Sequence, residues 1–94
     1  MITALDAETI TVSTSAVKLT ASKLTHPNVN KVIMYIEGSL RYWSSGLAPT
    51  SSTGMILVDE LVQFDLPEAS ELKMIRSGGS DAKVHVQYCQ ERNA

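Results

Sequence analysis

The side chains best suited to metal binding in this chain are His26, His85 and Cys89. Histidine and cysteine both bind zinc, and a zinc site needs three or four ligands at suitable spacing. Cys89 follows His85 by four residues, and two strand positions that far apart share a face but lie ~13 Å from each other. His26 precedes Pro27 in an expected turn. The spacing therefore argues against a metal site, and no cofactor is expected.

Cys89 alone is a candidate nucleophile. A reactive thiol needs a neighbouring base and a lowered pKa, and the adjacent Tyr88 and Gln90 supply neither. Most acidic residues fall at expected strand ends or turns, where paired carboxylates would find no cleft for hydrolysis. Gly78-Gly79 precedes an expected strand rather than the helix that a phosphate-binding loop requires. The chain is therefore predicted not to be an enzyme.

Residues that favour binding are concentrated between Leu40 and Gly54. Arg, Tyr and Trp are enriched at interface hot spots. On a strand, Arg41 and Trp43 face one way and Tyr42 the other. If Tyr42 faces the core, Arg41 and Trp43 face outward beside a loop rich in serine and threonine. The alternative places Trp43 in the core, and the sequence leaves both open. A sugar-binding platform would want more than one exposed ring.

The elements that must carry these residues are strands. Apolar and polar residues alternate with a period of two, which puts one face of each strand on a core. Turn residues separate these runs at intervals of roughly 8–12 residues, as in a sandwich or barrel. We predict an all-β fold, a small antiparallel β-sandwich or barrel-like domain of about seven or eight short strands. The clearest runs are 9–13, 17–20, 32–37, 62–66 and 83–88.

Turn signals predict two hairpins. Glu37-Gly38-Ser39-Leu40 indicates a tight hairpin, and Ser77 to Asp81 indicates a second one between strands 72–77 and 83–89. Pro67 precedes good helix formers, which predicts at most one helical turn near 67–71.

Length and composition indicate one globular domain, 1–94, with short arms at 1–7 and 91–94. Charged residues are only 19% of the chain, which suits a protein that packs against other proteins. The net charge is −2 and the basic residues are scattered, so nucleic acid is not an expected partner. A single cysteine fits a reducing compartment. Neither a membrane helix nor a secretory signal is expected.

The chain resembles small structural proteins of tailed bacteriophages, several of which are capsid decoration (cement) proteins. The resemblance covers about Ile10 to Tyr88 and carries no catalytic residues. It rests on a Thr-rich opening strand, Leu40-Arg41-Tyr42-Trp43-x-x-Gly46-x-x-Pro49-Thr50-x-x-x-Gly54, the run Leu61 to Leu66, Leu72-x-x-Ile75-Arg76-Ser77, and Val84-x-Val86-x-Tyr88.

This resemblance implies a virion structural protein that binds the outer surface of the phage head and stabilises it. The implied partners are the major capsid protein and the chain itself, as a homotrimer, with no nucleic acid, membrane or small-molecule substrate. Such a protein is made in the bacterial host cytoplasm and resides on the capsid surface. The alternatives are another phage component (tail, head-completion or fibre-base protein) and a glycan-binding β-module. The predicted contact residues are Ile2, Leu5, Arg41, Trp43, Leu47 and Pro49.

Overall fold

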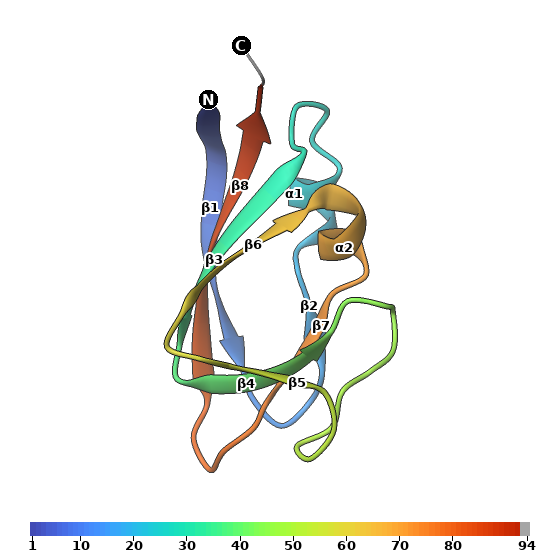
Figure 1. The fold of residues 1–94 in the computed structure, drawn as a ribbon, viewed down its shortest axis with the longest axis vertical. Coiled ribbons are helices and arrows are strands. Elements are labelled where there is room, and N and C mark those ends of the chain that lie inside the picture. Colours follow the sequence, from blue (N-terminus) through green and yellow to red (C-terminus); the bar gives the residue numbers. More distant parts are fainter. Residues whose placement is uncertain (93–94) are drawn as a thin grey trace.

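The computed structural model describes residues 1–92 as two antiparallel four-stranded sheets packed face to face (Figure 1). The predicted all-β sandwich is confirmed. Sheet A has the strand order β1-β8-β3-β6, and sheet B has the order β2-β7-β4-β5. The elements are β1 (Ile2–Val12), β2 (Val17–Lys18), α1 (Ala21–Leu24), β3 (Lys31–Glu37), β4 (Ser39–Trp43), β5 (Met55–Val58), β6 (Leu61–Asp65), α2 (Leu66–Ser70), β7 (Lys73–Arg76) and β8 (Ala82–Glu91).

The chain is folded as one long antiparallel ribbon that has been rolled up. β4 pairs with β5, β3 with β6, β2 with β7 and β1 with β8. Successive pairs of this ribbon alternate between the two sheets, and rolling adds the pairs β3–β8 and β4–β7. An eight-stranded double sheet wound in this way is a jelly roll. Residues 44–54 close the ribbon at one end, and the two chain termini lie at its open end.

Both predicted hairpins are wrong, although both turns exist. β3 and β4 flank Gly38 but belong to different sheets, and so do β7 and β8 on either side of Ser77 to Asp81. Turn residues bend the chain but do not say which sheet the next strand joins. Gly38 has a φ of 103°, and a Cβ atom there would lie 3.4 Å from the Ala82 Cα. Glycine is therefore suited to this corner between the sheets.

Strand alternation places the core between the sheets, as predicted. Met34 and Ile36 of β3 and Leu40 of β4 are fully buried. Tyr42 packs against this core with its ring edge-on to Phe64, at a centroid distance of 5.7 Å. Because Leu40 and Tyr42 face inward, Arg41 and Trp43 face outward.

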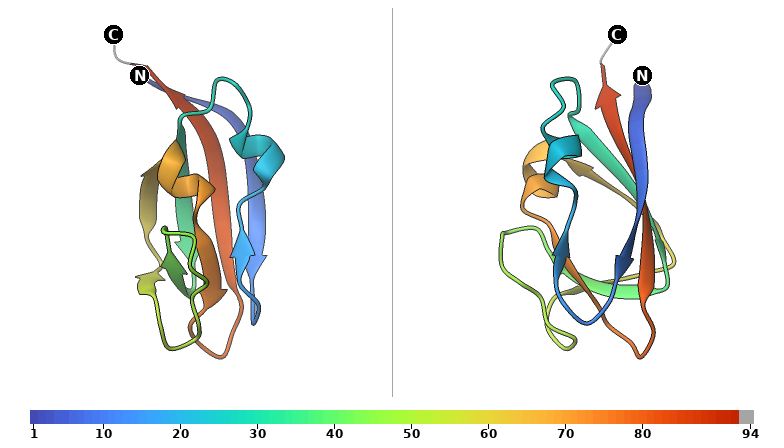
Figure 2. Two further views of the ribbon diagram at one scale, coloured as in Figure 1. Left: turned by 90° about the vertical axis from the view of Figure 1, so that its right-hand side faces the viewer. Right: turned by 180° about the vertical axis from the view of Figure 1, so that it is seen from behind.

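Residues 2–7, predicted as a loose arm, belong instead to β1. Ile2 pairs with Glu91, and the Met1 ammonium donates to the Arg92 carbonyl at 2.7 Å. The partner strand lies at the other end of the sequence, so no local pattern could reveal it. β1 and β8 together form a ribbon that reaches one pole of the molecule (Figures 1 and 2). Of the predicted C-terminal arm, Glu91 ends β8, whereas residues 93–94 lie outside the described residues.

Two short helices cover one end of the sandwich (Figure 2). α2 confirms the helical turn predicted near 67–71, with Pro67 in its first turn. α1 was not predicted, and it contradicts the expectation of at most one helical turn. Four residues are too few to show a helical period, and Leu24 is the one buried residue of α1. Within residues 1–92, no helix has the length and apolar character needed to cross a membrane.

Candidate functional site

The outer face of sheet B carries Arg41 and Trp43, two of the six predicted contact residues. Residues paired across an antiparallel ladder share a face. Trp43 pairs with Lys73, and Lys73 pairs with Lys18, so these side chains form one row across three strands. Arg41 and Ile75 form the next row. Trp43 is half-buried on this face rather than part of the core.

Arg41 holds the 44–54 loop against this face. Its guanidinium donates from Nε to the Ser51 carbonyl at 3.1 Å and from Nη1 to the Gly54 carbonyl at 2.9 Å. The backbone of Gly54 lies so close that a Cβ atom there would come within 3.2 Å of both the Arg41 Cβ and the Pro49 Cβ. The main role of Arg41 in this fold is therefore to fasten the loop.

Pro49 is buried beneath the loop. It offers no surface to a partner, contrary to the prediction that it is a contact residue. Leu47, only two residues earlier, is 64% exposed. Ile2 and Leu5 are 41% and 38% exposed, and Leu5 occupies the register shift between β1 and β8. Contacts through Leu47, Ile2 and Leu5 remain predictions.

The predicted contact residues thus fall into two groups rather than one site. Ile2 and Leu5 lie in β1, whose first residues reach the pole where the N-terminus lies, whereas Leu47 lies in the loop that follows β4, away from that pole (Figure 1). The molecule is 42 Å long and about 20 Å wide. The two groups can therefore touch different neighbours at the same time.

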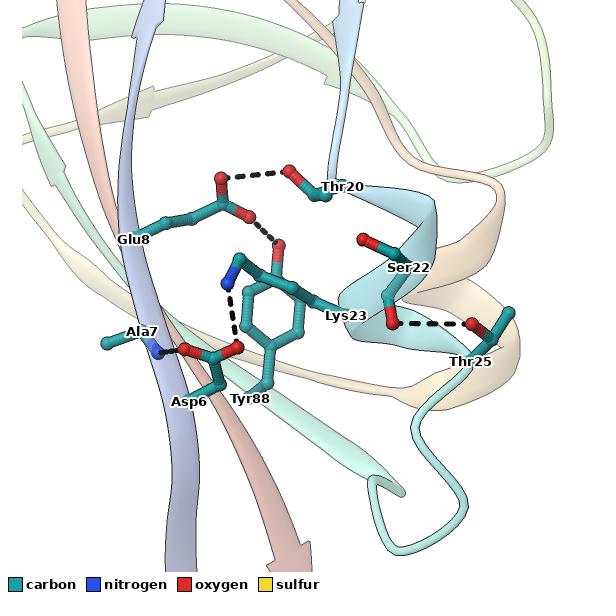
Figure 3. Close-up of polar contacts among 8 residues, drawn as sticks. All are labelled: Asp6, Ala7, Glu8, Thr20, Ser22, Lys23, Thr25 and Tyr88. Carbon is teal, nitrogen blue, oxygen red and sulfur yellow. Dashed lines mark hydrogen bonds and ion pairs between the residues drawn. The ribbon is translucent and has the colours of Figure 1, made fainter.

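A polar cluster joins β1, α1 and β8 at the side of the core (Figure 3). The Tyr88 hydroxyl donates to Glu8 Oε2 at 2.5 Å, and the Thr20 hydroxyl donates to Glu8 Oε1 at 2.8 Å. Burial, reinforced by the neighbouring Glu8 carboxylate, raises the pKa of Tyr88 well above its usual range. The phenol is therefore a neutral donor, and the cluster is structural. A tyrosine on the apolar side of a strand needs a partner for its hydroxyl. The position of Tyr88 in the sequence therefore implies a hydrogen-bond partner, but it does not say that this partner is Glu8.

An exposed ion pair lies next to this cluster. Lys23 Nζ donates to Asp6 Oδ2 at 2.7 Å. This bond, followed by the bond from the Ala7 amide, lowers the pKa of the Asp6 carboxyl, and the same contact raises the pKa of Lys23. The contact fastens β1 to α1.

Asp6→Asn is expected to flatten the acid side of the stability profile. A carboxyl whose pKa is lower in the folded state stabilises that state above its unfolded pKa, and this contribution is lost as pH falls through the folded value. Urea unfolding between about pH 5 and pH 2 should therefore show a shallower fall in the free energy of unfolding. Lys23→Met should flatten the curve in the same way, and the double variant no further. An unchanged slope in Asp6→Asn would contradict this account.

The outer face of sheet A carries a second row, formed by Thr9, His85, Tyr35 and Leu61 in register across all four strands. The Thr9 hydroxyl lies 3.1 Å from His85 Nδ1, and His85 Nε2 lies 3.2 Å from Glu37 Oε1. The row lines an open depression of about 470 Å³.

This order of hydroxyl, imidazole and carboxylate is also that of an acyl-transfer triad, which additionally needs free N–H groups converging on an oxyanion. His85 and Tyr35 lie on inner strands of the sheet, where backbone N–H groups bond to the strands on either side. Their N–H groups are therefore already used by the sheet.

Cys89 is fully buried, and burial raises the pKa of its thiol. A buried thiol of raised pKa is a poor nucleophile. Among residues 1–92, no three histidine, cysteine or acidic side chains are placed to hold one metal ion.

No protein-family model, curated protein or solved structure matches this chain. The inference of its function therefore starts from its exposed surfaces.

Proposed function

We propose that the protein is a virion structural protein, a capsid decoration protein that binds the outer surface of a phage head and stabilises it. The observation that carries this proposal is the separation of two exposed apolar groups, Ile2 with Leu5 on the β1–β8 ribbon and Leu47 on the loop. A molecule with two separate contact surfaces can bridge two capsid subunits. Bridging at many sites on a shell adds up, because each further contact becomes intramolecular once the first has formed.

The fold supports the proposal by analogy. Jelly rolls build many viral capsid domains, but they also build lectins and cupins. Fold alone therefore does not assign a function. The resemblance to phage structural proteins favours the first of these uses, and the low fraction of charged residues suits a protein that packs against others.

The double substitution Ile2→Asp/Leu5→Asp is expected to weaken binding to heads by roughly tenfold or more, because carboxylates would enter an apolar contact. Binding is measured by cosedimentation with heads stripped of the protein. Thr11→Asp is the matched control, since Thr11 is an exposed residue of the same strand. Equal binding by the double variant and the control would show that the β1–β8 ribbon does not contact the head.

Two measurements on particles test the function itself. Quantitative mass spectrometry of purified heads and tails should find this chain in heads at hundreds of copies, whereas a tail or head-completion role gives few. Heads without the protein should open at lower temperature or lower salt stress than heads to which it has been restored. Unchanged resistance would rule out the stabilising role.

Glycan binding is a second candidate, favoured by the outer face of sheet A. Tyr35 is 44% exposed and stands in the depression beside His85 and Gln87. A sugar can stack on such a ring while amide and imidazole groups bond its hydroxyls. Titration with a panel of mono- and oligosaccharides, followed through the NMR signals of Tyr35 and His85, distinguishes the two. No shift with any sugar would remove this candidate.

A further inference from the structure

The outer edge of sheet B is an apolar strand without a partner. β5 lies at the end of the order β2-β7-β4-β5 and, among residues 1–92, pairs with β4 alone. Met55, Ile56 and Val58 are each about half exposed, at 56%, 50% and 49%. Leu61, just beyond the Asp59-Glu60 turn, is 63% exposed. Ile56 and Val58 lie on the outer face of sheet B, Met55 lies on its inner face, and Leu61 lies on the outer face of sheet A. The β5 edge is therefore apolar on both of its faces.

The other three sheet edges carry features that discourage pairing. Charged residues, bulges and very short strands all block the addition of another strand. β1 has an irregularity at Leu5 followed by charged residues, β2 is two residues long and ends in Lys18, and β6 ends in Asp65. Met55–Val58 contains no charge, proline or bulge. β5 is the unprotected edge.

Part of the main chain of β5, at Ile56, is available on its outer side. The Asp59 amide donates inward to the Gly38 carbonyl, whereas the Val58 amide donates to its neighbour Glu60 at Oε2, 3.2 Å away. Because successive residues of a strand point their amides in opposite directions, the amide and carbonyl of Ile56 face outward like those of Val58. A new strand would meet Ile56 first.

We propose that a second copy of this chain occupies this edge, its β5 antiparallel to the first, so that the two B sheets become one eight-stranded sheet. A two-fold axis makes such a contact self-complementary. It also fits the charges. The acidic Asp59 and Glu60 follow one end of β5, and Arg41 binds the Gly54 carbonyl just before the other end. Antiparallel pairing places the acidic end of each copy against the Arg41 end of its partner. The proposal does not depend on the capsid function.

Light scattering over a range of protein concentrations tests the dimer. The unaltered chain should pass from monomer to dimer mass as its concentration rises. Ile56→Lys should raise the dissociation constant by roughly tenfold or more, because it places a charge in the apolar contact. Thr11→Lys, on the exposed part of the β1 edge, is the matched control and should dimerise normally. A monomer at every concentration, or a trimer that Ile56→Lys leaves intact, would overturn the proposal.

Amide hydrogen exchange on the unaltered protein gives a second test that needs no variant. Exchange of the Ile56 amide should slow as concentration rises, because that amide becomes bonded across the two-fold axis. The Leu57 amide faces β4 and should exchange at the same rate throughout. Concentration-independent exchange at Ile56 would show that β5 stays unpaired, even if the protein associates through another surface.

Discussion

Gly54→Ala is expected to destabilise the protein by about 2–4 kcal/mol, combining backbone strain with overpacking. Gly54 has a φ of 128°, a conformation that residues with side chains rarely adopt. An added Cβ would lie 3.1 Å from the Pro49 Cβ and 3.3 Å from the Tyr42 carbonyl oxygen. Relieving these contacts means lifting the loop, which would break the bonds from Arg41 and expose Pro49. Thermal unfolding should show a fall in Tm of roughly 8 °C or more.

Gly78→Ala is the control for this prediction. Gly78 lies in an open turn where an added methyl group would have no atom within 4 Å, and its φ is not in the left-handed region. Alanine there should leave stability unchanged, or raise it by up to about 1 kcal/mol by restricting the unfolded chain. If Gly54→Ala and Gly78→Ala unfold at the same temperature, close packing at Gly54 does not hold the loop against the sheet.

Tyr88→Phe is expected to cost about 1.5–3 kcal/mol, the range for a hydrogen bond to a charged group. The hydroxyl of Tyr88 is one of two donors to the partly buried Glu8 carboxylate, and without it the carboxylate keeps only Thr20. Tyr88 itself is fully buried, so water cannot readily replace the lost donor. Denaturant unfolding measures the loss, and the Tyr88→Phe/Glu8→Gln double variant should lose less than the sum of the single ones.

Tyr35→Phe provides the comparison for Tyr88→Phe. It removes the same hydroxyl from the exposed outer face of sheet A and should change stability by no more than about 0.5 kcal/mol. If both variants lowered the free energy of unfolding by a similar amount, the hydrogen bond from Tyr88 to Glu8 would not stabilise the fold.

Sequence periodicity was enough to predict most of the strands and their inner faces. Val32, Met34 and Ile36 follow the predicted alternation and are all buried in the structure. The same reasoning left open which of Tyr42 and Trp43 faces the core, and the structure places Tyr42 inward and Trp43 outward. These predictions succeeded because a strand's two faces are a local property of the chain.

Pairing could not be predicted because it is not local. Gly38 marks a bend whether the next strand joins the same sheet or the opposite one, so the expected hairpin became a crossing between sheets. The contact between Glu8 and Tyr88 was not predicted because Tyr88 lies 80 residues further along. Pro49 was predicted to be a surface contact residue because nothing in the loop sequence indicates that Arg41 bonds the loop backbone and holds the loop against the sheet.

The position of β8 has a consequence for synthesis on the ribosome. Of the eight strands β8 is made last, yet it lies between β1 and β3 inside sheet A. Until residues 82–91 have emerged, β1 has no neighbour in its sheet and β3 is paired along one edge only, with β6. Such late, non-local pairing is slow and leaves apolar surface exposed meanwhile. A nascent chain of this protein can form β4–β5 early, but it cannot complete sheet A until residues 82–91 have been made.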